Sequence, residues 1–163
     1  MQVDKVSVLS AEFSNEVRAR FTEAFIDVTS QYYRNRIARM LDFEDGLAYR
    51  GYLWDCLIAP RVINYQTAVS LVHGKDCTGY VMWDIHSTRY LRIPNYWKFP
   101  KASVVKIYLP DFRSVEHLFP EDVYIFDETL AWTCVLTHEY TEKNSRWCLR
   151  AERQSTKAAT EKS

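Results

Sequence analysis

The chain has 163 residues and a formal net charge of zero, because 21 basic side chains are balanced by 21 acidic ones. A neutral chain lacks the basic surface with which proteins usually bind nucleic acids or anionic membranes, so we expect neither as a partner. With 47% hydrophobic residues the chain is too apolar for a disordered protein, and its length fits one domain.

The N-terminus shows no basic stretch followed by an apolar core, and no apolar run approaches the roughly eighteen residues of a membrane helix. We therefore expect a cytoplasmic protein. Four cysteines lie far apart in the sequence, without a C-x-x-C pair. This spacing favours reduced, buried thiols over disulfides or a metal site, and no motif predicts a cofactor.

Two helices are predicted near the N-terminus. Over residues 13–28 the apolar side chains recur every three or four positions, which is typical of an amphipathic helix, and Ser10 is its expected N-cap. A second, shorter helix is expected over residues 33–41, followed by a loop at residues 42–46. Three arginines, Arg34, Arg36 and Arg39, fall on the second helix and are expected to face solvent.

An aromatic block begins at Gly51, which we expect to permit a close backbone approach. The spacing after it predicts a short helix over residues 53–57, ending near Pro60. Another helix is expected over residues 66–73, and Gly74 is expected to end it.

After this point the hydrophobic period changes to two, which predicts strands at residues 80–85, 89–93 and 104–109. The loop between the last two contains Tyr96, Trp97 and Phe99. Exposed aromatic side chains are natural anchors for a protein partner, although the same rings can fold back and cover the sheet.

The segment from 122 to 139 reads as a β-hairpin, with two apolar, β-branched and aromatic runs separated by the turn at residues 127–129. A last strand is expected at residues 145–149. The pattern predicts an α+β fold, with the N-terminal helices on one face of a mostly antiparallel sheet of about five strands. We expect one domain over residues 1–150 and a flexible tail over residues 151–163, which lacks large apolar residues.

Alternation along the second strand of the hairpin places Trp132, Leu136 and His138 on one face and Glu139 on the other. Because Trp132 and Leu136 mark their face as the core, His138 is expected at the end of a buried row. It is then a general base, a metal ligand or a hydrogen-bonded edge histidine, and the lack of a second ligand nearby favours the last. Other polar residues that the fold can bring to it are Asp84, His86 and His117.

Asp127 and Glu139 are expected at opposite ends of the hairpin. A paired-carboxylate hydrolase needs its two carboxylates within roughly 5 to 10 Å, so this geometry disfavours it. Asp127 is better explained as a turn residue whose carboxylate accepts backbone N–H groups.

Residues 111–128 contain six acidic residues and one basic residue, Arg113. Such a run is either a solvated face or a surface that meets a basic partner. The candidate binding residues from these arguments are Tyr96, Trp97, Phe99, Glu121, Asp122, Asp127, Glu128, His138 and Glu139.

The G-Y-L-W block at residues 51–54, together with Asp122, Tyr124, Asp127, W-T at 132–133 and T-H-E at 137–139, resembles a family of small bacterial cytoplasmic proteins that is a domain of unknown function. The resemblance covers most of residues 13–149 and implies the fold, with no catalytic residue to carry over. The T-H-E ending also looks like that of several bacterial immunity proteins, which bind and neutralise toxins.

The leading hypothesis from the sequence is therefore a non-enzymatic protein-binding module, an immunity or antitoxin-like protein with a toxin domain as partner. The first alternative is a small hydrolase-like enzyme that uses His138, Glu139 or Asp127 at the sheet edge. The second is a structural or oligomerisation module, since the sequence does not fix the oligomeric state.

Overall fold

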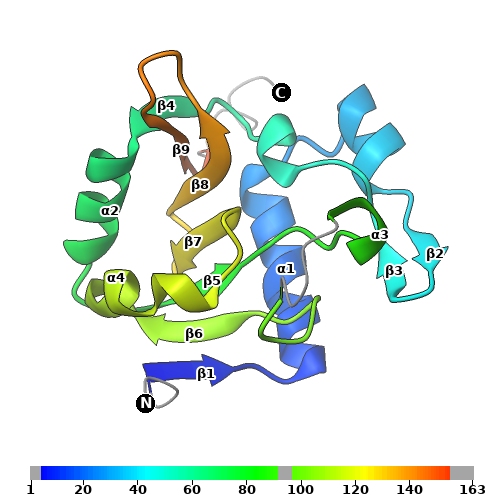
Figure 1. The fold of residues 1–163 in the computed structure, drawn as a ribbon, viewed down its shortest axis with the longest axis horizontal. Helices are drawn as coiled ribbons and strands as arrows, with labels where there is room; N and C mark the ends of the chain where they lie inside the picture. Colours follow the sequence, from blue (N-terminus) through cyan, green and yellow to red (C-terminus); the bar gives the residue numbers. More distant parts are fainter. Residues whose placement is uncertain (1–4, 92–96, 155–163) are drawn as a thin grey trace, which may run out of the picture.

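The computed structural model describes residues 5–91 and 97–154 and contains a seven-stranded antiparallel sheet (Figure 1). The strand order is β1-β6-β5-β7-β8-β9-β4, and a separate pair, β2-β3, lies beside this sheet. The strands are β1 (Val6–Val8), β2 (Leu41–Phe43), β3 (Gly46–Ala48), β4 (Arg61–Asn64), β5 (Thr78–Met82), β6 (Val105–Tyr108), β7 (Val123–Asp127), β8 (Trp132–Tyr140) and β9 (Arg146–Glu152).

Helices cover both faces of the large sheet. Phe21 of the first helix packs on Tyr124 and Phe126 of β7, while the second and fourth helices belong to a separate core on the opposite face. The α+β class is confirmed, and the first helix covers one face as expected. The helices are α1 (Ala11–Phe25), α2 (Tyr65–His73), α3 (Thr88–Leu91) and α4 (Phe112–Val115), with 3₁₀ turns at Leu53–Cys56, Leu109–Asp111 and Glu116–Leu118 and a π-helix at Tyr33–Ile37.

The central strands need cover on both faces because both of their faces are apolar. Every residue of β7 is buried, and along β5 Tyr80 and Met82 join the core under α1 while Val81 joins the core under α2. Continuous apolar runs are typical of strands covered on both sides. The Y-V-M-W and V-Y-I-F runs therefore explain why the helices divide between the two faces.

Helix α1 begins where the sequence predicts. The Ser10 hydroxyl accepts a hydrogen bond from the Phe13 N–H at 3.1 Å, which satisfies one of the free donors of the first turn. The helix ends at Phe25, and Ile26 continues in extended conformation and bridges to Leu57. Its buried side chains fall on one stripe, so its predicted amphipathic character is confirmed.

Several local predictions differ from the structure. The expected second helix is the short π-helix, and residues 41–48 form the β2-β3 hairpin, in which Gly46 adopts a φ of +102°. The strand expected at residues 89–93 begins as helix α3, and residues 92–96, with Tyr96, lie outside the described residues. Strand β9 extends to Glu152, three residues beyond the expected end.

The G-Y-L-W block is held against the π-helix. Gly51 N–H donates to the Arg36 carbonyl at 3.2 Å, and a Cβ on Gly51 would lie 2.7 Å from the Arg36 Cβ. The predicted close backbone approach at Gly51 is therefore confirmed, and it fixes the path of the chain into the 3₁₀ turn at Leu53–Cys56.

Candidate functional site

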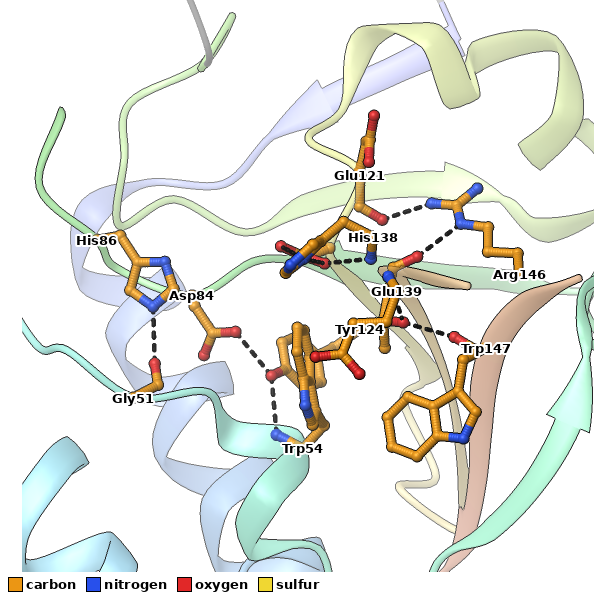
Figure 2. Close-up of polar contacts among 12 residues, drawn as sticks. Gly51, Trp54, Asp84, His86, Glu121, Tyr124, His138, Glu139, Arg146 and Trp147 are labelled. Carbon is orange, nitrogen blue, oxygen red and sulfur yellow. Dashed lines mark hydrogen bonds and ion pairs between the residues drawn. The ribbon is translucent and has the colours of Figure 1, made fainter. Parts of the chain in front are cut away.

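The most distinctive polar contact at the surface joins Asp122, just before β7, to His138 in β8 (Figure 2). The His138 Nδ1 lies 2.8 and 2.9 Å from the two Asp122 carboxylate oxygens, and the His138 backbone N–H donates to the same carboxylate at 2.7 Å. The Asp122 side chain is 8% exposed and that of His138 is 42% exposed. A buried carboxylate therefore orients an exposed imidazole.

This contact fixes the tautomer of His138. A carboxylate only accepts hydrogen bonds, so the nitrogen that faces it, Nδ1, carries the proton. In the neutral ring Nε2 then has a free lone pair. Burial raises the pKa of Asp122, an effect that the hydrogen bonds from His138 oppose. The pair has the form of a carboxylate–histidine dyad, which can act as a base or accept a hydrogen bond from a ligand.

The face of His138 differs from the one that alternation predicts. Between Leu136 and Tyr140, β8 advances four residues while its partner β9 advances two, from Cys148 to Arg146, so the ladder contains a bulge. The prediction that His138 continues the buried row of Leu136 is wrong. Its ring instead lies toward the α1 side of the sheet, 6.0 Å from the Trp54 ring.

Arg146 supports the bulged segment from the other side. Its guanidinium donates to the carbonyls of Thr137 at 2.8 Å and Glu121 at 2.6 Å (Figure 2). It also forms an ion pair with Glu116 at 3.2 Å. These bonds give a donor to the carbonyl of Thr137, which lies in the irregular part of β8, and to that of Glu121 before β7. The position of His138 is consequently fixed by two side chains, Asp122 and Arg146.

Aromatic rings form the floor beside His138. Tyr52 stacks on Trp54 with ring centroids 4.1 Å apart, and the His86 and His138 rings lie 4.9 and 5.8 Å from Tyr52. Trp54 is buried and Tyr52 is half-buried. His86 is buried, and its Nε2 lies 2.7 Å from the Gly51 carbonyl. This contact helps to hold the G-Y-L-W block in place.

Beneath these rings lies a buried carboxylate. Asp84 accepts hydrogen bonds from the hydroxyls of Tyr49 at 2.6 Å and Tyr124 at 2.8 Å, and from the Leu53 N–H at 3.1 Å. The Tyr124 hydroxyl in turn accepts from the Trp54 N–H at 3.0 Å (Figure 2). Burial is the main cause that raises the pKa of Asp84. This network ties the 3₁₀ turn to β5 and β7, and thus positions Tyr52 and Trp54.

The electrostatic environment of Tyr52 is negative. Its pKa is raised to about 12, first by burial and then by the charges of Asp122 and Asp84, with a further contribution from Glu139. Glu139 is exposed, and within the described parts of the chain its carboxylate has no ion pair. Each of these carboxylates disfavours a further negative charge at Tyr52 and would attract a positive one.

Asp127 lies at the opposite end of the hairpin and is a turn residue, as predicted. Its carboxylate accepts hydrogen bonds from the Thr129 N–H at 3.0 Å and from the Trp132 indole N–H at 2.9 Å. The turn places Leu130 at a φ of +53°. Asp127 is buried and therefore contributes neither to the His138 site nor to an exposed acidic surface.

The predicted acidic surface is not continuous. Asp122 and Asp127 are buried and hydrogen-bonded, whereas Glu121 and Glu128 are exposed at opposite ends of β7. Glu128 forms an ion pair with Lys106 at 3.2 Å. These side chains therefore belong to different surroundings, and the acidic residues near His138 are Glu121, Asp122 and Glu139.

The aromatic loop folds back on the sheet, which is one of the two outcomes that the sequence allows. Phe99 and Trp97 are half-buried and pack against the core under α2 and α4. The Phe99 ring lies 6.1 Å from both Trp83 and Phe119. Tyr96 lies outside the described residues, so its predicted role stays a prediction.

Other kinds of chemistry find little support in the described parts of the chain. There, no group of three or more His, Cys, Asp and Glu side chains is placed to hold a metal ion. Burial raises the pKa of Cys134 to about 12 and that of Cys56 to about 11, so these thiols are poor nucleophiles. None of the described helices is long and apolar enough to cross a bilayer.

The Asp122–His138 contact was not foreseen from the sequence, although hairpin register contains the signal. Phe126 pairs with Thr133 and Val123 with Leu136, so one further step places Asp122 opposite Thr137 and next to His138. Tyr52 and Trp54 give no comparable signal, because 68 residues separate Trp54 from Asp122 and their meeting depends on the whole fold.

Comparison of the chain with protein-family models, with curated proteins and with solved structures finds no match. The resemblance to the bacterial family with the G-Y-L-W and T-H-E blocks therefore stays a prediction, and the function must be argued from the site itself.

Proposed function

We propose that this protein is a non-enzymatic protein-binding module, of the immunity type that neutralises a toxin by binding it. It would bind through the surface formed by Tyr52, His138 and Glu139, which we call the β8-end surface. The observation that carries the proposal is that the bulge turns His138 onto the half-buried Tyr52 ring, beside Glu139, which is exposed and forms no ion pair with any described residue. Aromatic rings flanked by polar groups are characteristic of protein interfaces.

The remaining candidate catalytic residues support a binding role. Asp84, His86 and Asp127 are buried and each satisfies hydrogen bonds that hold the fold. Hydrogen bonds within the protein engage both carboxylate oxygens of Asp84 and of Asp127, and the Nε2 of His86. The proposal places the protein in the bacterial cytoplasm, and its four cysteines, all free thiols, suit a reducing compartment.

The test is capture followed by reconstitution. The tagged protein is used as bait in its native cell, beside an unrelated protein with the same tag. We expect it to retain a specific partner that arrests growth when expressed alone and is neutralised by co-expression of this protein. A specific partner that causes no arrest, or no specific partner at all, would contradict the immunity function.

The Asp122–His138 pair favours a second candidate function, general acid–base catalysis on a small substrate. The carboxylate holds Nδ1–H and leaves Nε2 free, which is the arrangement of a histidine base. A panel of ester, amide and phosphoester substrates tests this function. Turnover that is lost in His138→Asn would support it, whereas turnover that is equal in the two proteins would assign the activity to a contaminant.

A further inference from the structure

We propose that the β8-end surface binds a basic side chain of the partner protein, with an arginine as the best fit. The inference rests on the proposed function, and it specifies the chemistry that the partner must present. A neutral chain gives no reason to expect a preference for a charged ligand, but the side chains around Tyr52 include three carboxylates.

The first support is the arrangement of the carboxylates. Glu139 is exposed at the rim, and Asp122 lies buried beside it. Burial is the main cause that raises the pKa of Asp122, and the charge of Asp84 adds to it. The charge of Asp84 therefore disfavours the ionised form of Asp122, and a cation brought to the surface would relieve that cost.

The second support is that no lysine or arginine forms an ion pair with Asp122 or Glu139 within the described residues. Asp84, by contrast, has a cation near it, because Arg18 interacts with its charge and donates to the carbonyl of the neighbouring Trp83 at 2.9 Å. The side chain in contact with Asp122 is the imidazole of His138, which, unlike lysine or arginine, is not a permanent cation. The nearby Arg146 directs its guanidinium to Glu116 and to backbone carbonyls instead.

The third support is the shape and chemistry of the floor. Tyr52 is half-buried and stacked on Trp54, so its ring is held in place. A guanidinium can stack on a tyrosine ring and at the same time form paired hydrogen bonds with a carboxylate such as Glu139. The free Nε2 of His138 adds an acceptor for a further N–H. A planar cation with several donors matches this set better than an ammonium group does.

A peptide titration tests the inference independently of the partner. The probes are capped tripeptides with a central arginine, lysine or citrulline, and the readout is the amide NMR spectrum of the intact protein. We expect saturable shifts at Tyr52, His138 and Glu139 with the arginine peptide, weaker ones with lysine and none with citrulline. Citrulline has the shape of arginine without its charge, so equal shifts with both would overturn the inference.

Matched variants separate a specific site from general charge attraction. Glu139→Gln removes the exposed carboxylate of the surface, and Glu142→Gln removes an exposed carboxylate from the β8-β9 loop. Glu139→Gln should weaken the arginine peptide roughly tenfold, which corresponds to about 1.4 kcal/mol, and Glu142→Gln should leave it unchanged. Equal effects of both variants, or shifts that are absent at the β8-end surface, would contradict the proposal.

The outcome also distinguishes this inference from the proposed function. If a toxic partner is captured and neutralised, but the affinity of that partner is the same for Glu139→Gln and for the wild-type protein, the basic-side-chain inference fails and the binding function stands. If the arginine peptide binds as expected and no partner is captured, the immunity function fails and the site itself is supported.

Discussion

Tyr124→Phe is the substitution that tests the buried network under the β8-end surface most sharply. It removes one hydroxyl from a fully buried ring and keeps the ring itself. The loss leaves Asp84 with two of its three hydrogen bonds and leaves the Trp54 N–H without its acceptor. The substitution therefore affects one buried donor and one buried carboxylate at once.

The magnitude follows from these two groups. A hydrogen bond to a charged group contributes about 1.5 to 3 kcal/mol, and an unsatisfied buried N–H costs about 1 to 3 kcal/mol. Allowing for relaxation, we expect the free energy of unfolding to fall by about 3 kcal/mol, a large share of the roughly 5 to 15 kcal/mol typical of a domain. Tyr49→Phe removes one hydrogen bond from Asp84 and leaves every backbone N–H with its acceptor, so we expect about half that loss of stability.

Urea denaturation followed by tryptophan fluorescence measures both losses. Tyr108→Phe is the matched control, because it also removes a tyrosine hydroxyl that contacts an aspartate, Asp76, but on an exposed ring. We expect no measurable change for it. If Tyr124→Phe unfolds at the same urea concentration as the wild-type protein, the network does not contribute to stability and the reasoning is refuted.

Three further predictions follow from the same contacts. Gly51→Ala would place its Cβ 2.7 Å from the Arg36 Cβ and should lower the free energy of unfolding by at least about 2 kcal/mol in thermal or urea unfolding; unchanged stability would contradict the close approach. Asp122→Ala should convert His138 from the Nδ1–H tautomer toward the commoner Nε2–H tautomer in long-range ¹H–¹⁵N spectra above pH 8, and an unchanged tautomer would contradict the assigned contact. Burial is the main cause that raises the pKa of Asp84 above the ordinary 3.8, so the folded protein holds this proton more tightly than the unfolded chain does. The resulting stabilisation is complete below pH 3.8 and is lost as the pH rises through the native pKa. The stability of the wild-type protein minus that of Asp84→Asn should therefore fall as the pH rises above 3.8, and a difference that rises would contradict the assignment.

The core of the fold could be predicted because its signals are local and strong. The apolar runs of β5, β7 and β8, the turn at Asp127 and the capped helix α1 all follow from neighbouring residues. The edge strands β1 and β4 contain three and four residues, too few for alternation to be recognised. The division of the helices between two faces also went unrecognised, although the continuous apolar strands contain that signal.

The site was harder to predict because it depends on a defect in the regular pattern. Alternation assigns His138 to the buried row, and only the bulge after Leu136 turns it toward Tyr52. No local sequence pattern predicts that bulge, because the residues that stabilise it, Asp122 and Arg146, come from other segments of the chain. For the acidic residues 111–128 the sequence pattern misleads in the opposite direction. They are close in the sequence but do not form one acidic surface, because Asp122 and Asp127 are buried.

The most direct test of the account is hydrogen–deuterium exchange of this protein with and without its purified partner. A competing surface for the partner is the β2-β3 hairpin, on which Leu41 and Leu47 are exposed. The account predicts that the partner slows exchange at residues 51–55 and 137–141 and leaves residues 41–48 unchanged. Protection confined to residues 41–48 would contradict the assignment of the β8-end surface as the binding site.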